Sequence, residues 1–310
     1  MENIQDLLDR TAAFSRTKTE GGAPASYIPE LARADPALFS LSMTNFDGET
    51  YSSGDSDSLF SMQSISKVAA LCFAIETLGR ERVFSKIGME PCSEAFNSIM
   101  KLEMTSSIPL NPFINAGAIV LVEMLNERFQ ALAIAEIMDF FSRLLGRQSR
   151  NALHINEGIY RSEKRTADRN RALAYFLHNA GTLSGDVEET LDLYFKLCSI
   201  EVNTADLSVM GATIASGGRN PASGTTIMSL DTAYIVLGLM NVCGLYDQSA
   251  EFAVEVGVPA KSGVSGGILC AVPGRMGLAV FSPPLNNSGN SVAGIRALAD
   301  LSRELKLRGI

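Results

Sequence analysis

Histidine is nearly absent from this sequence. The chain of 310 residues holds only His154 and His178, and neither lies in a motif. A Ser-His-Asp triad or a histidine-rich metal site therefore lacks most of its usual groups. If a serine is activated in this protein, another side chain must take its proton, and lysine is the natural candidate.

Further absences narrow the class of protein. The net charge is −8 and there is no long basic run, so we expect neither nucleic acid nor an anionic membrane surface as a partner. No apolar run approaches the roughly 18–20 residues of a membrane span, and we expect no signal peptide. Five cysteines without close-pair spacing predict reduced core thiols of a cytoplasmic protein: Cys72, Cys92, Cys198, Cys243 and Cys270.

Hydrophobic residues make up 46% of the chain, enough for one large domain or two intimately joined ones. Apolar spacing predicts a helix within 1–20, a β-hairpin over 38–51, and mostly helices from 64 to 216. The segments 252–261, 267–272 and 276–282 are rich in Val, Ile and Ala and separated by Gly and Pro. They predict consecutive antiparallel strands, and a last helix follows over 292–307.

This order of elements predicts an α+β fold. The strands at the two ends of the chain most simply join into one antiparallel sheet flanked by helices. Residues 1–65 plus 218–310 would form the sheet domain. Residues 66–217 would form an inserted, mainly helical domain, with the active site between the two.

The sequence 60–67, Phe-Ser-Met-Gln-Ser-Ile-Ser-Lys, holds the first candidate for chemistry. A Ser/Asp/Gly-rich loop precedes it and a long apolar run follows, which predicts a helix start. Ser64 and Lys67 are three apart, so a hydroxyl and an amine that could take its proton share one helical face. The pattern is weak alone, because Ser15-Lys18 and Ser98-Lys101 also fit it, and because Ser64 could simply cap or pack the helix.

A second string strengthens this interpretation. Lys261-Ser262-Gly263 ends a predicted strand, and small residues there would let a ligand approach backbone N–H groups. Taken alone it could be a sheet bulge. Together, Ser-x-x-Lys and a downstream Lys-Ser-Gly resemble the penicillin-recognising serine enzymes, in which a helical domain is inserted into an α/β domain.

Longer strings narrow the resemblance to the serine-dependent glutaminase family, which shares the β-lactamase-like fold. They are spread in order from about residue 27 to 295, nearly the whole chain. One departure is Ala250, where the family leads us to expect glycine. The strings are 63–67 QSISK, 111–119 NPFINAGAI, Ser162-Glu163 with Arg169-Asn170, 244–247 GLYD, 259–264 PAKSGV and 289–291 GNS.

The resemblance implies hydrolysis of the side-chain amide of L-glutamine to L-glutamate and ammonia, with no metal and no cofactor. Ser64 would be the nucleophile, Lys67 its base and Tyr246 a proton relay, with the backbone N–H groups of Ser64 and Val264 as the oxyanion hole. It also implies a homo-oligomer, a dimer or a tetramer. The residues implied to hold the two ends of the substrate are Tyr27, Asn115, Glu163, Asn170 and Tyr194.

Each of these residues also has an ordinary structural interpretation. Asn115 could cap a helix, and Glu163 and Asn170 could lie on a solvated charged face. Tyr194 could pack in the core, and Tyr27 is expected to be a buried anchor.

The chemistry leaves two questions open. An ordinary lysine, with a pKa of about 10.4, is charged and useless as a base. Burial, or a second cation such as Lys261, would have to lower the pKa of Lys67. No cation is found among the implied substrate contacts, so the charge of the substrate carboxylate has no partner. Two other functions fit part of the pattern: a β-lactam-binding enzyme, and a glutamine sensor without catalysis.

Overall fold

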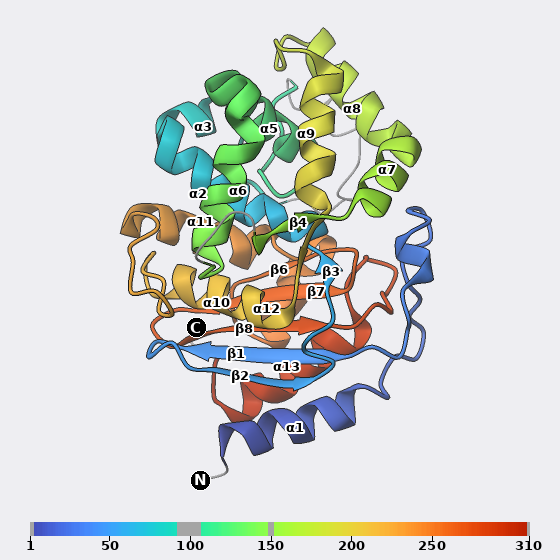
Figure 1. Cartoon of the computed structure of the whole chain (residues 1–310), viewed down its shortest axis with the longest axis vertical. Helices are drawn as coiled ribbons and strands as arrows, with labels where there is room; N and C mark the ends of the chain where they lie inside the picture. The colour runs from blue at the N-terminus through green and yellow to red at the C-terminus, as the bar shows by residue number, and fades with distance from the viewer. Residues whose placement is uncertain (1–2, 92–106, 148–151, 309–310) are drawn as a thin grey trace.

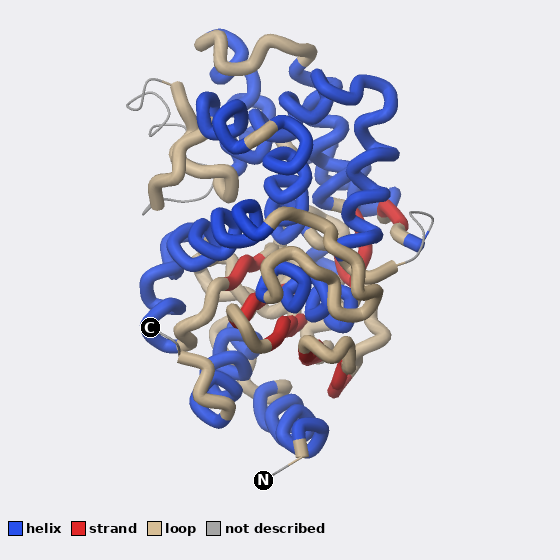
Figure 2. The backbone as a smooth tube through the Cα atoms, turned by 90° about the vertical axis from the view of Figure 1, so that its left-hand side faces the viewer, coloured by secondary structure: helices blue, strands red, loops and turns tan. Residues whose placement is uncertain are grey.

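The structure, a computed structural model, describes residues 3–91, 107–147 and 152–308. A sheet lies toward one end of the molecule and a group of helices lies at the other end (Figure 1). Both termini are at the sheet end (Figures 1 and 2). Of the described helices, none is both long and apolar enough to cross a bilayer.

The main sheet joins strands from both ends of the chain, as predicted. Every neighbouring pair is antiparallel, and β1 lies directly beside β8, with Ser40 opposite Phe281. The predicted hairpin forms from the first two strands. The strand order is β2 (Thr50–Gly54), β1 (Ser40–Asn45), β8 (Met276–Phe281), β7 (Gly267–Val272) and β6 (Ala260–Ser262).

Helices cover both faces of this sheet. α1 (Ile4–Ser15) and α13 (Val292–Glu304) pack on one face, and α10 (Thr204–Ala215) packs on the other. Alternate residues of β7 therefore enter different cores: Cys270 packs with α1 and α13, whereas Leu269 joins the core that includes α10. All six residues of β7 are buried, as expected of a strand covered on both sides.

The helical group carries most of the pocket described below. In it, α2 packs on α5, α6 and α11, while α9 packs on α5, α7 and α8. Its helices are α2 (Ser66–Leu78), α3 (Arg80–Lys86), α5 (Asn115–Phe129), α6 (Ala133–Leu144), α7 (Glu157–Thr166), α8 (Asp168–Asn179), α9 (Val187–Cys198) and α11 (Leu230–Cys243). The division of the chain into 1–65 plus 218–310 and 66–217 remains a prediction.

A small second sheet also forms, which the sequence did not predict. Its order is β3 (Phe60–Ser61), β5 (Ile200–Val202), β4 (His154–Ile155). Strands of two or three residues are too short to show an alternating pattern. Here β3 leads straight into the turn that carries Ser64, so this sheet fixes the start of that turn.

One predicted strand is wrong in its first half. The segment 252–261 begins inside a helix, α12 (Ser249–Glu255), and only Ala260–Ser262 pairs in the sheet. Phe252 and Val256, four apart, are buried, whereas Val254 between them is 70% exposed. That is helical periodicity, and the high content of valine concealed it.

Helix α10 lies so close to the sheet that glycine is required at the contact. A Cβ on Gly277 of β8 would lie 2.0 Å from the carbonyl oxygen of Ser208 and 2.2 Å from the backbone nitrogen of Ala212. Gly277→Ala should lower the free energy of unfolding by roughly 1–3 kcal/mol, because helix and sheet must separate. Urea unfolding measures this change.

Gly238→Ala is the matched control. Gly238 lies in α11 and nothing stands within 4 Å of the added Cβ. That variant should be neutral, or more stable by up to about 1 kcal/mol through helix propensity. Equal stability of the two variants would contradict the close contact between α10 and the sheet.

Candidate active site

A small cavity of about 70 Å³ opens where the N-terminal segment, the helical group and the β6–β7 turn meet. Seven of the nine residues predicted for the site line it, and the other two, Lys67 and Tyr246, are buried at 2% and 7% exposure. Its lining is Tyr27, Ile28, Gln63, Ser64, Asn115, Glu163, Thr166, Ala167, Arg169, Asn170, Tyr194, Cys198 and Val264.

Ser64 sits on a strained turn. It is the middle residue of a short 3₁₀ turn, η2 (Gln63–Ile65), directly before α2, which begins at the predicted position. Gln63 has a φ of 47°, a left-handed conformation that costs about 1–3 kcal/mol for a non-glycine residue. Ser64 itself is 7% exposed and reaches the pocket. Strain of this kind is typical of a functional turn.

Two backbone donors beside Ser64 are unused. Val264 lies in the β6–β7 turn, which is closed by a 2.9 Å bond from the N–H of Gly266 to the carbonyl of Gly263. In the described parts of the chain, neither the N–H of Ser64 nor that of Val264 donates to another protein group. Both residues line the pocket. Free amides in such a place can bind a developing negative charge.

Lys67 is buried below the pocket among neutral oxygens. Its Nζ donates to Asn115 Oδ1 at 2.7 Å and to the Phe113 carbonyl at 3.2 Å. No ion pair to Lys67 occurs among the residues that the structure describes. Burial lowers the pKa of Lys67 to about 8, although the charge of Glu163 opposes that shift. A substantial fraction of neutral amine at physiological pH is what a base requires.

Of the two predicted causes, burial rather than a second cation is therefore the one that lowers the pKa of Lys67. Lys261 is fully buried, and its Nζ donates to the carbonyls of Gly244 at 2.8 Å and Ser262 at 2.7 Å. Its own pKa lies well below the usual value, because of burial first and the charge of Lys67 second.

Tyr246 is in contact with both Lys261 and Ser64. It begins the 3₁₀ turn η5 (Tyr246–Gln248) with a φ of 57°, so it too is in a left-handed conformation. Lys261 Nζ stands 4.2 Å from its ring centroid. Burial raises the pKa of Tyr246 to about 12, although hydrogen bonds with Ser64 and Ser262 lower it in part. The phenol is thus protonated and in contact with Ser64.

Glu163 gives the pocket a buried carboxyl group. It is 6% exposed and accepts a 3.4 Å hydrogen bond from Gln63 Nε2. Burial raises the pKa of Glu163 to about 7, while bonds from Gln63 and Cys198 and the charge of Lys67 pull it down. A cationic ligand would supply the charge partner that burial makes valuable.

The two asparagines are held in one orientation. Asn115, the first residue of α5, accepts from Lys67 through Oδ1 and donates through Nδ2 to Asn170 Oδ1 at 2.8 Å. The amide of Asn170 therefore has its Nδ2 to offer a ligand. The charged-surface interpretation of Glu163 and Asn170 is wrong, because both line the cavity.

The two tyrosines of the pocket differ in exposure. Tyr194 is 4% exposed and serves both core and pocket, with its ring 6.0 Å from Lys67 Nζ. Tyr27 was expected to be buried and is 52% exposed, because its segment crosses the pocket mouth rather than the core. Burial of its hydroxyl still raises the pKa of Tyr27 well above the usual value, as do Tyr246 and Glu163 nearby. The side chain is thus half exposed, while its hydroxyl is largely shielded from water.

Sequence reasoning assigned no role to several lining residues. Gln63 and Arg169 stood inside the recognised strings, yet polar residues next to a motif give no sign of their direction. Cys198 was expected to be a core thiol; it is buried and unpaired, and it also lines the pocket. Cys72, Cys243 and Cys270 are likewise buried, and within the described structure none of the three forms a disulfide.

Of the two other Ser-x-x-Lys matches, only one lies in the described part of the chain. Ser15 ends α1, away from the pocket lining, and Ser98-Lys101 falls outside the described residues, as does Cys92. Over the described ranges, no group of three or more His, Cys, Asp or Glu side chains is arranged to hold a metal ion.

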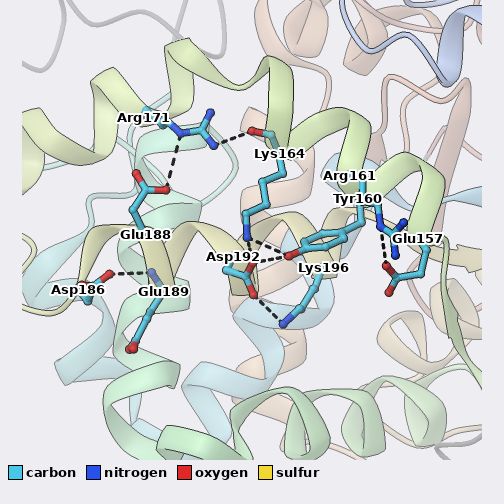
Figure 3. Close-up of polar contacts among 10 residues, drawn as sticks. All are labelled: Glu157, Tyr160, Arg161, Lys164, Arg171, Asp186, Glu188, Glu189, Asp192 and Lys196. Carbon is cyan, nitrogen blue, oxygen red and sulfur yellow. Dashed lines mark hydrogen bonds and ion pairs between the residues drawn. The ribbon is translucent and has the colours of Figure 1, made fainter.

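A charged network fastens the helices of the pocket from outside (Figure 3). Asp192 of α9 bonds Lys196 at 2.6 Å and also pairs with Lys164 and Tyr160 of α7. Burial would raise the pKa of Asp192, but the bonds from Lys164, Lys196 and Tyr160 lower it to about 2. Arg171 of α8 donates to the carbonyl of Lys164 at 2.6 Å. These are the helices that bring Glu163, Asn170 and Tyr194 together.

Comparison with known proteins gives one consistent result. The model of the family Glutaminase matches residues 22–309. A glutaminase of Clostridium tetani (strain Massachusetts / E88) is 45% identical over 98% of this chain and 99% of its own, and glutaminase 2 of Clostridium perfringens (strain 13 / Type A) is 42% identical over the same shares.

Solved structures agree with this result. A Bacillus glutaminase superposes with a TM-score of 0.91 at 33% identity, over 99% of this chain and 100% of its own. A probable glutaminase from Bacillus subtilis in complex with 6-diazo-5-oxo-L-norleucine gives 0.90 at 32% identity, over 100% and 98%. The predicted α+β fold of the β-lactamase type is confirmed.

The buried state of Lys67 can be measured through stability. Folded Lys67 has a pKa of about 8 against an ordinary 10.5, so between these pH values the unfolded chain binds more protons. The free energy of unfolding of the wild type should therefore rise relative to Lys67→Met as pH increases from 8 to 10.5, by about 3 kcal/mol. Below pH 8 Lys67 is protonated in both the folded and the unfolded chain, so the difference in unfolding free energy should no longer change with pH. Urea unfolding at several pH values gives the difference, and a constant gap would contradict the lowered pKa.

The network around Asp192 predicts an unequal effect of two similar substitutions. Asp192→Asn leaves two lysines without their charge partner and should cost roughly 1–2 kcal/mol of unfolding free energy. Asp139→Asn, which breaks an exposed pair with Arg143 on α6, should cost less than about 0.5 kcal/mol. Thermal unfolding of both variants is the measurement. Equal losses would mean that the network does not fasten α7 to α9.

Proposed function

The chain belongs to the glutaminase family, and from that premise we propose that it hydrolyses L-glutamine through an acyl-enzyme on Ser64. Family membership makes it a hydrolase of the side-chain amide of glutamine, yielding glutamate. The finer steps are our proposal. The observation that carries them is a serine on a strained turn, with a buried lysine whose pKa is lowered beneath the same pocket.

In the first half-reaction Ser64 Oγ attacks the amide carbon of glutamine. The hydroxyl proton passes to the neutral amine of Lys67, with Tyr246 as the relay that touches Ser64. The tetrahedral intermediate collapses as the leaving nitrogen takes that proton, and ammonia departs. A glutamyl ester on Ser64 remains, and water attacks it by the reverse route to release glutamate.

The oxyanion of the intermediate would lie between the free N–H groups of Ser64 and Val264. One such donor contributes roughly 3 kcal/mol to lowering the barrier, because it is aimed at charge that develops only in the transition state. Gly263 keeps this turn close to Ser64, since a Cβ there would lie 2.7 Å from the carbonyl of Met62.

The remaining residues would hold the amino acid itself. Glu163 pairs with the ammonium group, and its raised pKa then falls because the ligand supplies a positive charge. Asn170 donates to the carboxylate, with Asn115 fixing its orientation. Tyr27 and Tyr194 close the two sides. The relative from Bacillus subtilis was solved with a ligand that is, by its name, also a free L-amino acid.

We further propose a cytoplasmic homo-oligomer, a dimer or a tetramer, that needs neither metal nor cofactor. This proposal follows the resemblance and the buried cysteines, which form no disulfide within the described ranges.

Ammonia release from a substrate panel tests the function: L-glutamine, L-asparagine, glutathione and a β-lactam. Ser64→Ala should lose at least about 10³-fold in kcat, whereas Ser15→Ala, at the other described Ser-x-x-Lys, should keep its activity. Lys67→Ala should lose kcat with a smaller change in KM. Full activity of Ser64→Ala would sink the serine mechanism, and a change in KM alone would make Lys67 a binding residue.

The same panel separates the alternatives. Labelling of Ser64 by a penicillin with no turnover of glutamine would favour a β-lactam-binding enzyme. Binding of glutamine by calorimetry without turnover would favour a sensor.

A further inference from the structure

The charge balance of the pocket points to a residue that no role above includes. A free amino acid brings one ammonium and one carboxylate group, and Glu163 can pair with only the first. Among the described residues that line the cavity, the one cationic side chain is Arg169. Lys67 and Lys261 lie deeper, with their ammonium groups bonded to backbone and asparagine oxygens.

Arg169 lies next to the residue proposed above to bind the substrate carboxylate. It is the second residue of α8 and adjoins Asn170, whose amide already offers Nδ2 to the pocket. Its side chain is exposed at the rim, whereas Glu163 is 6% exposed and deeper. The N-terminal end of α8 carries the positive end of the helix dipole, which favours a negative group there, although the carboxylate of Asp168 in the same turn opposes it.

We propose that Arg169 binds the α-carboxylate of the substrate and makes the site selective for amino acids in which that carboxylate is free. This inference rests on the proposed function and adds the residue that determines specificity. A guanidinium offers several N–H donors in a fixed plane, so it can pair with a carboxylate through two parallel bonds. With Glu163 on the ammonium group, two opposite charges then orient the same α-carbon.

This arrangement also places the reacting amide. Because the two charged groups of the substrate sit on one carbon, fixing both leaves the side chain one direction toward Ser64. A substrate whose α-carboxylate is blocked, as within a peptide chain, cannot form this ion pair with Arg169 and loses that orientation. The site should therefore reject glutamine residues inside proteins on grounds of charge as well as size.

Kinetics with a matched pair of substrates tests the proposal. L-glutamine carries the carboxylate, and its α-amide keeps the ammonium and the side-chain amide but has no charge there. Arg169→Gln should lower kcat/KM for L-glutamine by about 10–100-fold, the range of a charge-assisted bond, and should change that for the α-amide by less than roughly 3-fold. Arg169→Lys should lie between. Arg165→Gln, an exposed arginine of α7 outside the pocket lining, is the control and should match the wild type.

A binding measurement separates this inference from the proposed reaction. Calorimetry with L-glutamate, and with L-isoglutamine, which is glutamate with its α-carboxylate amidated, requires no turnover. Weaker binding of glutamate by Arg169→Gln, with isoglutamine unchanged, supports the proposal even if glutamine is not hydrolysed. Equal losses for both ligands or both substrates would assign Arg169 a structural role and overturn the proposal, as would no loss for either or no binding of glutamate to the wild type.

Discussion

The chemistry proposed for this protein depends on the removal of one ammonium group, that of Lys67, from water. Lys67 lies under the pocket with two neutral oxygens as its partners, and that burial lowers its pKa to about 8. An ion pair with a carboxylate would have kept the Lys67 amine charged and inert as a base. The fold holds this unfavourable group because α2 is buried along most of its length and cannot turn the lysine outward. Stability is thereby given up at the place where reactivity is needed.

The helices around the pocket divide their work between two faces. Toward the pocket, α7, α8 and α9 present Glu163, Asn170 and Tyr194, which are separate in the chain. Away from it, the same helices carry the bonds among Lys164, Asp192 and Arg171 that hold them together (Figure 3). The inner groups are costly to bury, while the outer ones form favourable, partly exposed bonds. A change on the outer face should therefore act on substrate binding through geometry.

The sequence was sufficient for much of the fold, because long periodic segments are local signals. The spacing of Ser64 and Lys67 is also a local signal, and the roles predicted from it remain a proposal. It failed where tertiary packing decides. The valines of helix α12 led to the prediction of a strand. Tyr27 was predicted to be buried, although its segment crosses the pocket mouth. The direction of Arg169 depends on how α8 meets the cavity, which spacing alone does not contain. The choice between burial and a second cation as the cause of the lowered pKa of Lys67 likewise depends on how the whole neighbourhood packs.

The pairing of β1 with β8 has a consequence for biosynthesis. Residues 40–45 pair with 50–54 on one side, but their partner on the other side is 276–281, near the other end of the chain. A ribosome making this protein must deliver nearly all of it before the central strands can meet, so β1 and β2 wait as an unmatched hairpin while the helices emerge. The turn that carries Val264 precedes β7 and β8 and is held by them. If Val264 acts as proposed, the nascent chain should stay inactive until its last strands arrive, and a chain cut short should expose sheet edges.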